Sequence, residues 1–135
     1  MMTETWTPEQ FRKYQSKRGA GSKSKYKAKR TEYQGILYDS KLEAAFASIL
    51  DVFIQAGDVL SWTRQIPFII GMDEKGKAMI HRVDFLIHYP DRTFEYVEVK
   101  GFDKREGKIQ RCFVNEKYGI DITLVFNPRE WQPKG

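Results

Sequence analysis

Apolar residues recur with two different periods along this chain, and the change of period divides it into expected elements. After Ser40 the apolar positions have helical spacing, and this pattern ends at Gly57. The positions are Leu42, Phe46, Ile49 and Phe53. Because serine is a favoured N-cap and glycine a favoured C-terminal stop, the pattern predicts a helix over residues 41–56.

Beyond residue 60 the apolar period becomes two, which is typical of β-strands. The predicted strands are 61–70, 78–89 and 94–100. A short strand or a hairpin around Gly35, within residues 33–38, is expected before the first helix. Because Pro67 cannot donate a ladder hydrogen bond, we expect the strand that contains it to lie at a sheet edge or to be irregular there.

A second helix and a last strand complete the expected domain. The helix is predicted over about 104–117 and stops at Gly119, while the apolar run 121–127 predicts a short buried strand. A strand–helix–strand crossover joins parallel strands, so residues 121–127 should lie parallel to 94–100 in a mixed sheet. The expected fold class is α/β, in the order helix, three-strand meander, helix, strand.

The positive charge of the chain is concentrated in one segment. The formal net charge is +5, yet residues 11–31 hold nine of the 23 Lys and Arg and no acid, which leaves the rest at −4. Thr7 and Pro8 predict a short helix to about Lys17, and the Gly-, Ser- and Lys-rich stretch after it is typical of a flexible arm. We therefore expect residues 1–30 to form a basic arm that binds a polyanion, or else only a solubilising leader, before a domain over 31–135.

Composition excludes several classes of protein. The single cysteine, Cys112, rules out a disulfide framework and a cysteine-rich zinc site. No apolar run reaches the roughly 18 residues of a membrane span. The first ten residues also lack the pattern of a secretory signal. We therefore expect a cytoplasmic protein with no membrane partner.

Two neighbouring strands carry the residues best suited to chemistry. Alternation along 94–100 (FEYVEVK) places Glu98 and Lys100 on one face, about 7 Å apart, and the preceding strand carries Asp84 as its one acid. Pairing through the turn at 90–93 brings Asp84 near the level of Glu98. Two adjacent carboxylates repel unless a cation lies between them, and Mg²⁺ prefers such oxygen ligands. The alternative is that all three are ordinary polar positions, with Glu98 and Lys100 forming a surface pair.

Glu43 has two interpretations. It stands three residues after Ser40, as in a capping box, where its carboxylate would bind back to the cap. Alternatively, it is a further acid that the first helix directs at the same site. Gln65, on the first strand of the meander, could likewise orient a ligand or simply be solvated.

The second helix is expected to present a polar face beside this site and an apolar face to the sheet. The polar set, at spacings of four, three and four, is Lys104, Lys108, Arg111 and Asn115. The apolar set is Ile109, Cys112 and Phe113. The cationic face suits a phosphate backbone, although a merely solvated face is an equal alternative. His81 and His88 have no partner at metal-ligand spacing, so we expect polar or packing roles for both.

The order of these residues resembles the PD-(D/E)XK nuclease superfamily, whose signature here is Asp84 followed by Glu98-Val99-Lys100. The stretches 23–44 (KSKYKAKRTEYQGILYDSKLEA), VDFLIHY and EVKGF are similar to a small phage and prophage family of unknown function within that superfamily. This similarity covers about residues 23–126. The proline of the superfamily's name is replaced here, since Val83 precedes Asp84.

The resemblance implies a restriction-endonuclease-like core and Mg²⁺-dependent cleavage of DNA phosphodiesters, with Mn²⁺ able to substitute. It assigns the metal to Asp84, Glu98 and the Val99 carbonyl, and the catalytic lysine to Lys100. Several members place a further acid where Glu43 stands, which favours its functional interpretation. The DNA-binding residues expected from the arm and the second helix are Lys23, Lys25, Lys27, Lys29, Arg30, Lys104, Lys108 and Arg111.

Similar phage enzymes act on branched DNA such as four-way junctions, often as homodimers, in recombination, replication or DNA processing. This implies a branched DNA partner and a location in the cytoplasm of a bacterial host. The alternative function is a non-catalytic nucleic-acid-binding or interaction protein of phage DNA metabolism, which uses the arm as a tether.

Overall fold

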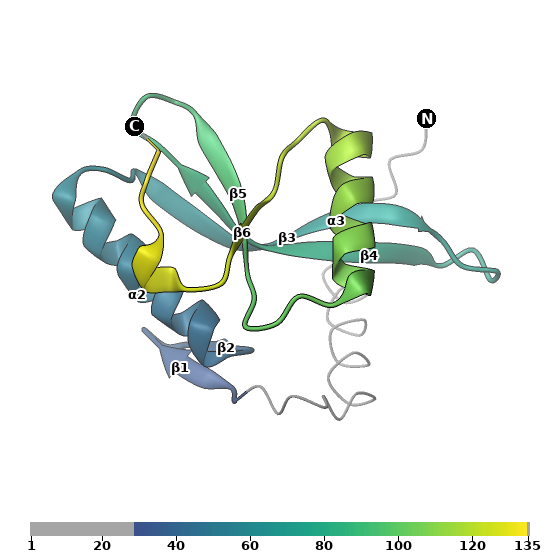
Figure 1. The fold of residues 1–135 in the computed structure, drawn as a ribbon, viewed down its shortest axis with the longest axis horizontal. Coiled ribbons are helices and arrows are strands. Elements are labelled where there is room, and N and C mark those ends of the chain that lie inside the picture. Colours follow the sequence, from purple (N-terminus) through teal and green to yellow (C-terminus); the bar gives the residue numbers. More distant parts are fainter. Residues whose placement is uncertain (1–28, 135) are drawn as a thin grey trace.

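A computed structural model describes residues 29–134 (Figure 1). The elements follow in the order β1 (Thr31–Tyr33), β2 (Ile36–Tyr38), α2 (Lys41–Ala56), β3 (Ser61–Met72), β4 (Ala78–His88), β5 (Phe94–Val99), α3 (Arg105–Tyr118), β6 (Thr123–Val125) and the 3₁₀ turn η1 (Pro128–Glu130). The helix expected to end near Lys17 lies outside the described residues, as do the arm residues Lys23, Lys25 and Lys27. The predicted order of helix, meander, helix and strand is confirmed.

The three strands of the meander and the strand after α3 form one mixed sheet in the order β3-β4-β5-β6. β5 and β6 pair in parallel, as the crossover predicted, and β3 lies at the edge, as Pro67 predicted. The antiparallel register of β4 and β5 pairs Phe85 with Val97 and His88 with Phe94. If this register is continued by one residue, Glu98 is level with Asp84, as pairing through the turn at 90–93 predicted.

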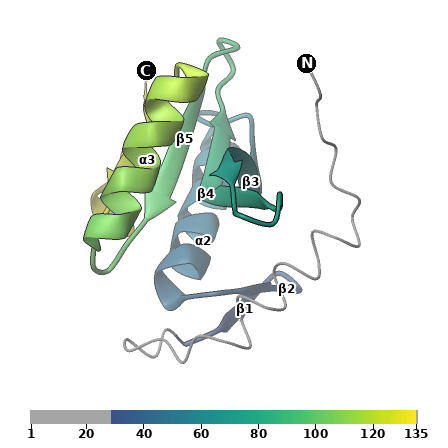
Figure 2. The ribbon, with the colours of Figure 1, turned by 90° about the vertical axis from the view of Figure 1, so that its right-hand side faces the viewer.

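The two long helices cover opposite faces of the sheet (Figure 2). Alternate residues of β5 belong to different hydrophobic clusters: Val97 and Val99 pack with α2, whereas Tyr96 packs with Val114 of α3. Strand residues alternate between faces, so the two clusters lie on the two sides of the sheet. The α2 side holds the larger core, which includes Phe46, Leu50 and Phe85.

The first helix begins and ends as its sequence predicted. The Ser40 hydroxyl accepts a hydrogen bond from the Glu43 N–H at 3.1 Å, and Gly57 ends the helix with a φ of 86°. That left-handed conformation favours glycine because it has no Cβ. The cap fixes the first turn of α2, from which Glu43 extends towards the sheet.

The second helix packs on the sheet through a different face from the one predicted. Ile109 and Phe113 are 59% and 45% exposed and Cys112 is also exposed, whereas Arg111 and Val114 are buried. The expectation that the apolar set would pack on the sheet is therefore wrong. An electrostatic contact accompanies this choice of face, because β5 presents the buried acid Glu98 to this helix and Arg111 pairs with it.

A local irregularity divides the long hairpin of β3 and β4 into two halves. Gln65 has a φ of 56°, and it and Asp84 are left out of the ladder between the pairs Arg64–Phe85 and Ile66–Val83. Phe85 packs on the α2 side, yet Val83, two residues away, packs on the α3 side. Simple alternation would give both residues the same face, so the strand changes its facing direction at Asp84. Each of the two helices therefore packs on a different half of the hairpin (Figure 1).

The C-terminal segment contributes to the core in a way that the sequence pattern did not predict. After η1, Trp131 is buried against α2, with its ring 5.2 Å from Phe46 and 5.6 Å from Phe53 in edge-to-face contacts. The tail also returns to the sheet, where the Lys134 N–H donates to the Tyr89 hydroxyl at 3.1 Å. Such contacts stabilise the face of α2 that is turned away from β1 and β2.

Candidate active site

Three charged side chains meet where the end of β5, the irregular point of β4 and the first turn of α2 come together. The Val99 N–H donates to the Asp84 carboxylate at 2.8 Å, which fixes Asp84 against the end of β5. A Cβ on Gly101 would lie 3.3 Å from the Leu42 side chain, so the chain after Lys100 runs directly past the start of α2. Glu43 is therefore close to Asp84 and Lys100, as the functional interpretation predicted.

The Glu43 carboxylate is buried and poorly compensated. Its Oε2 atom has no hydrogen-bond partner among residues 29–134, and the reciprocal capping bond to Ser40 is not formed there. Burial raises the pKa of Glu43 from 4.5 to about 8, and repulsion from Asp84 and Asp39 adds to this effect, while the Lys100 and Arg64 charges oppose it. The serine caps the helix alone, and the acid extends into the protein.

Asp84 stands between two other acids. Burial raises its pKa from 3.8 to about 6; the charge of Lys100 and the Val99 N–H bond oppose the rise, and the charge of Glu98 adds to it. Asp84 and Glu43 each repel the other's negative charge. Two desolvated carboxylates next to one lysine form a site whose negative charge is incompletely neutralised.

Glu98 is fully buried and has specific partners on the α3 side. One of its oxygens contacts His81 Nε2, and the other accepts from Arg111 at 3.2 Å. Arg111 also donates to Asp103 at 2.6 Å. The other nitrogen of His81, Nδ1, lies 2.8 Å from Gln110 Oε1. The structure thus engages each Glu98 oxygen with one partner on the α3 side.

This network bears on the predicted roles of two residues. Arg111 was expected on a phosphate-binding face with Lys104 and Lys108, but it is buried in an ion pair, so its direct contact with DNA is not supported. His81 was expected to have a polar or a packing role, and the structure gives it a polar one, in contact with the central acid of the site. A lone histidine in a strand gives no signal of this, because its neighbour Glu98 is 17 residues away in sequence.

The remaining candidate residues lie around the acids. Lys104 and Lys108 are exposed at the start of α3, shortly after Lys100. Lys29 and Arg30 are exposed where the chain enters β1. Gln65 is level with Asp84 on the neighbouring strand, in the left-handed conformation that non-glycine residues seldom adopt. Strained residues of this kind cluster at functional sites.

The donor set fits a small, hard cation. Glu43 Oε2 is an unpartnered buried acceptor, and the mutual repulsion of Glu43 and Asp84 would be relieved by a divalent ion between them. No group of three or more His, Cys, Asp or Glu side chains in the described part of the chain is arranged to hold a metal. Mg²⁺ suits such a site, because it keeps several waters and is commonly held by one or two carboxylates together with substrate phosphates.

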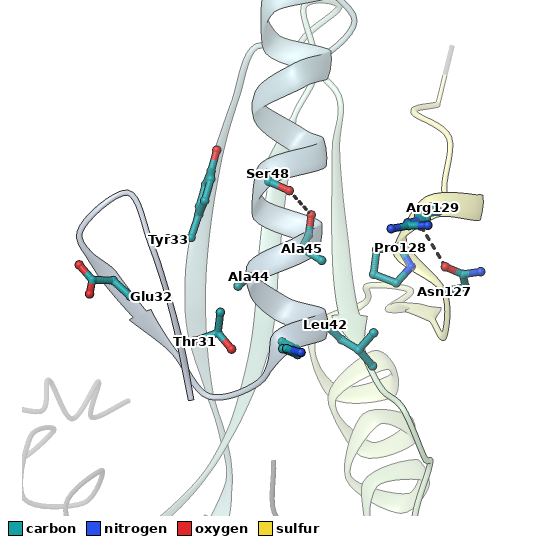
Figure 3. Close-up of a pocket in the computed structure, with 11 residues that line it drawn as sticks. Thr31, Glu32, Tyr33, Leu42, Ala44, Ala45, Ser48, Asn127, Pro128 and Arg129 are labelled. Atoms are coloured by element: carbon teal, nitrogen blue, oxygen red, sulfur yellow. Dashed lines mark hydrogen bonds between the residues drawn. The ribbon is translucent and has the colours of Figure 1, made fainter. Parts of the chain in front are cut away.

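An open groove of about 470 Å³ lies on the other side of the first turns of α2 (Figure 3). It runs between the β1–β2 hairpin and the start of η1, and Lys41 and Arg129 are among its lining residues. Leu42 lines the groove and also approaches Gly101, so one side chain separates the groove from the end of β5. None of Glu43, Asp84 and Lys100 lines it.

The fold and these residues define an α/β protein with a mixed four-stranded sheet and a buried acidic site at the end of its central strands. A family model described as "Protein of unknown function (DUF1064)" matches residues 23–130, so the chain belongs to this family. Neither the curated proteins nor the solved structures compared with the chain gave a match. Within residues 29–134, no helix is both long and apolar enough to cross a membrane.

Proposed function

We propose that this protein is a Mg²⁺-dependent DNA endonuclease with a restriction-endonuclease-like core, as the PD-(D/E)XK resemblance implies. The observation that carries the proposal is the pair of buried carboxylates, Glu43 and Asp84, beside Lys100 at the end of β5. Two buried acids that repel each other destabilise the fold when both are ionised, unless a cation is bound. A site of this composition is therefore better explained by binding of a metal and a phosphate than by stability.

Each residue has a defined role in this proposal. Asp84 and Glu43 would hold the cation, together with the Val99 carbonyl and the substrate phosphate. When bound, the cation stabilises negative charge on the phosphate and makes water more acidic. Lys100 positions the attacking water and offsets charge that develops on the phosphate oxygens. Glu98, through His81 and Arg111, fixes the end of β5 that carries Lys100.

The reaction is hydrolysis of a phosphodiester. The water oxygen forms a new bond to phosphorus, and the bond from phosphorus to the leaving sugar oxygen breaks. One water proton is transferred to the leaving oxygen and the other to solvent, which yields a phosphomonoester and a free hydroxyl. No oxidant or second substrate is required.

The charges outside the site support a DNA substrate. Nine basic residues and no acid between residues 11 and 31 provide sequence-independent attraction for phosphates. Lys104 and Lys108 extend a positive surface from Lys100 along the start of α3. Selectivity for branched or four-way DNA and action as a homodimer rest on the resemblance alone.

The alternative is a non-catalytic nucleic-acid-binding or interaction protein. A pure binder needs the basic arm but gains nothing from buried acids that would face the phosphates. The alternative therefore accounts for residues 11–31 and leaves Glu43, Asp84 and Lys100 unexplained.

The test incubates the full chain with linear, flapped and four-way DNA, with either Mg²⁺ or EDTA. Asp84→Asn and Lys100→Met should abolish cutting, whereas Asp58→Asn and Lys77→Met, exposed controls of the same chemistry, should cut normally. Thermal unfolding of each variant separates a lost site from a lost fold. Absence of Mg²⁺-dependent cutting of every substrate, or normal cutting by both site variants, would refute the proposal.

A further inference from the structure

Arg64 of β3 is a half-buried cation at the edge of the acidic site, and no anionic side chain pairs with it. None of the ion pairs or hydrogen bonds formed among residues 29–134 involves its guanidinium, and its Nε atom is buried without a partner. A buried N–H that donates to nothing costs free energy, so such groups in proteins usually serve a ligand or a bound water.

The guanidinium is held in place by an aromatic ring. Its central carbon lies 4.6 Å from the centroid of the Tyr38 ring, a cation–π contact. Tyr38 is fully buried at the end of β2 and belongs to the larger core. Because that ring cannot move without disrupting the core, it holds the guanidinium at this position before any ligand arrives. A fixed, planar fork of donors matches the oxygens of a phosphate group.

The strand register directs Arg64 towards the acids. Arg64 pairs with Phe85, the residue after Asp84, and Phe85 packs on the α2 side of the sheet. Directly paired residues of neighbouring strands point to the same face. Arg64 therefore lies on the side of the sheet that α2 covers, and the buried Glu43 belongs to the first turn of that helix.

We propose that Arg64, stacked on Tyr38, is a phosphate-binding residue that contacts a non-bridging oxygen of the DNA phosphate held at Glu43 and Asp84. This inference rests on the proposed nuclease function and adds a residue that the Asp–Glu-x-Lys signature does not contain. Arg64 orients the phosphate and stabilises its charge, while Lys100 acts on the water side. The neighbouring positive φ of Gln65 is the bend that brings Arg64 and Asp84 to this point.

A purely structural role, in which Arg64 serves as the counter-ion of Glu43, makes a different prediction. A structural counter-ion pairs directly with its acid, yet the described residues contain no ion pair between Arg64 and Glu43 or Asp84. A structural role also affects folding rather than the rate at saturating substrate. The two roles can therefore be separated by kinetics and by direct binding.

The kinetic test compares wild type with Arg64→Met and Arg64→Lys in single-turnover cleavage at saturating Mg²⁺ and DNA. Loss of one donor to a phosphate transition state should lower the rate roughly 100-fold for Arg64→Met. Arg64→Lys, which keeps the charge but not the planar fork, should retain an intermediate rate. Tyr38→Leu should resemble Arg64→Met, because it removes the ring that holds the guanidinium. Arg92→Asn is the control for loss of an exposed cation, since asparagine tolerates the φ of 72° at that turn.

A binding test does not depend on cutting. The side-chain Nε–H resonance of Arg64 is assigned by its absence from the Arg64→Lys spectrum. It is then followed by NMR while a short oligothymidylate of about six nucleotides is added in Ca²⁺. We expect a saturating shift of this resonance in wild type and in Tyr38→Phe, and a much smaller one in Tyr38→Leu.

The outcomes separate this inference from the proposed function. If wild type cuts DNA and folded Arg64→Met cuts at the same rate, the phosphate-binding role is wrong and the nuclease proposal stands. If wild type cuts nothing, the nuclease proposal fails and the NMR titration alone decides: an unmoved Arg64 resonance overturns the inference, and a saturating shift supports it. Unfolding temperatures of all variants identify any that fail to fold. If Arg64→Met fails to fold, the rate of Arg64→Lys and the NMR titration of wild type supply the decision.

Discussion

Replacement of Glu43 by glutamine should stabilise the metal-free protein, and more strongly as the pH rises. The folded state raises the pKa of this carboxyl from 4.5 to about 8, mainly by burial. Below both values the folded and unfolded chains are equally protonated, so stability is unaffected. Between them the unfolded chain releases a proton that the folded chain retains, so wild type loses stability as the pH rises until the folded pKa is passed.

The magnitude follows from the pKa difference. Each unit corresponds to about 1.36 kcal/mol, so wild type should lose about 4 kcal/mol between about pH 5 and pH 9 through this group. That is a large fraction of the 5–15 kcal/mol by which a typical domain is stable. Glutamine never ionises and is close in shape to the protonated acid, so the variant avoids this loss. Asp84 titrates in both proteins, so its contribution largely cancels.

The assay is urea unfolding of both proteins in EDTA at several pH values across this range. The difference in free energy of unfolding, variant minus wild type, should grow by about 4 kcal/mol from about pH 5 to pH 9. Added Mg²⁺ should restore stability to wild type at high pH, with little effect on the variant. Glu74→Gln, at an exposed turn, is the control and should follow wild type. Parallel curves for wild type and Glu43→Gln would show that the carboxylate is not buried and uncompensated as described.

Four further predictions test other parts of the structure. Arg111→Met leaves Glu98 with an unpaired buried charge, so chemical unfolding should show a loss of about 3–5 kcal/mol; a loss below 1 kcal/mol would contradict the network. On the same helix, Val114→Ala should lower the free energy of unfolding by about 2 kcal/mol and Phe113→Ala by no more than about 1, because only Val114 is buried. The reverse order in thermal unfolding would indicate that the face predicted from the sequence packs on the sheet. Gln65→Gly should relieve backbone strain and stabilise the fold by roughly 1 kcal/mol; a destabilised variant would mean that the side chain contributes more than its backbone costs. Removal of residues 1–30 should weaken DNA binding and reduce its salt dependence, measured by fluorescence anisotropy, while Mg²⁺-dependent cutting persists at higher DNA concentration; complete loss of cutting would favour a tether over a nuclease.

Local signals in the sequence were sufficient for the elements and much of the topology. The helical spacing between Ser40 and Gly57 determined α2 to the residue, because both of its ends are fixed by local capping bonds. The crossover from β5 to β6 determined their parallel pairing, since a strand–helix–strand connection returns in the same direction. The hairpin of β4 and β5 has a short turn, which limits the register and brought Asp84 level with Glu98. The charge asymmetry between residues 11–31 and the domain also follows from the sequence alone.

Other features depended on contacts between residues far apart in the chain. Helical spacing allows two faces of α3 equally well, and the face that is buried is that of Arg111, which pairs with the buried acid Glu98, and not that of Phe113. The role of His81 depended on the same acid, because His81 on β4 contacts Glu98 on β5, 17 residues away in the sequence.

The change of facing at Gln65 and Asp84 is likewise invisible to a pattern of period two, because one left-handed residue reverses the alternation beyond it. That reversal decided which acids meet and that Arg64 stacks on Tyr38 beside them. The sequence by itself therefore determined which residue types were available at the ends of the strands, because alternation and capping are local. Only the tertiary structure decided their partners and burial, because desolvation and repulsion depend on every element that closes around a charge.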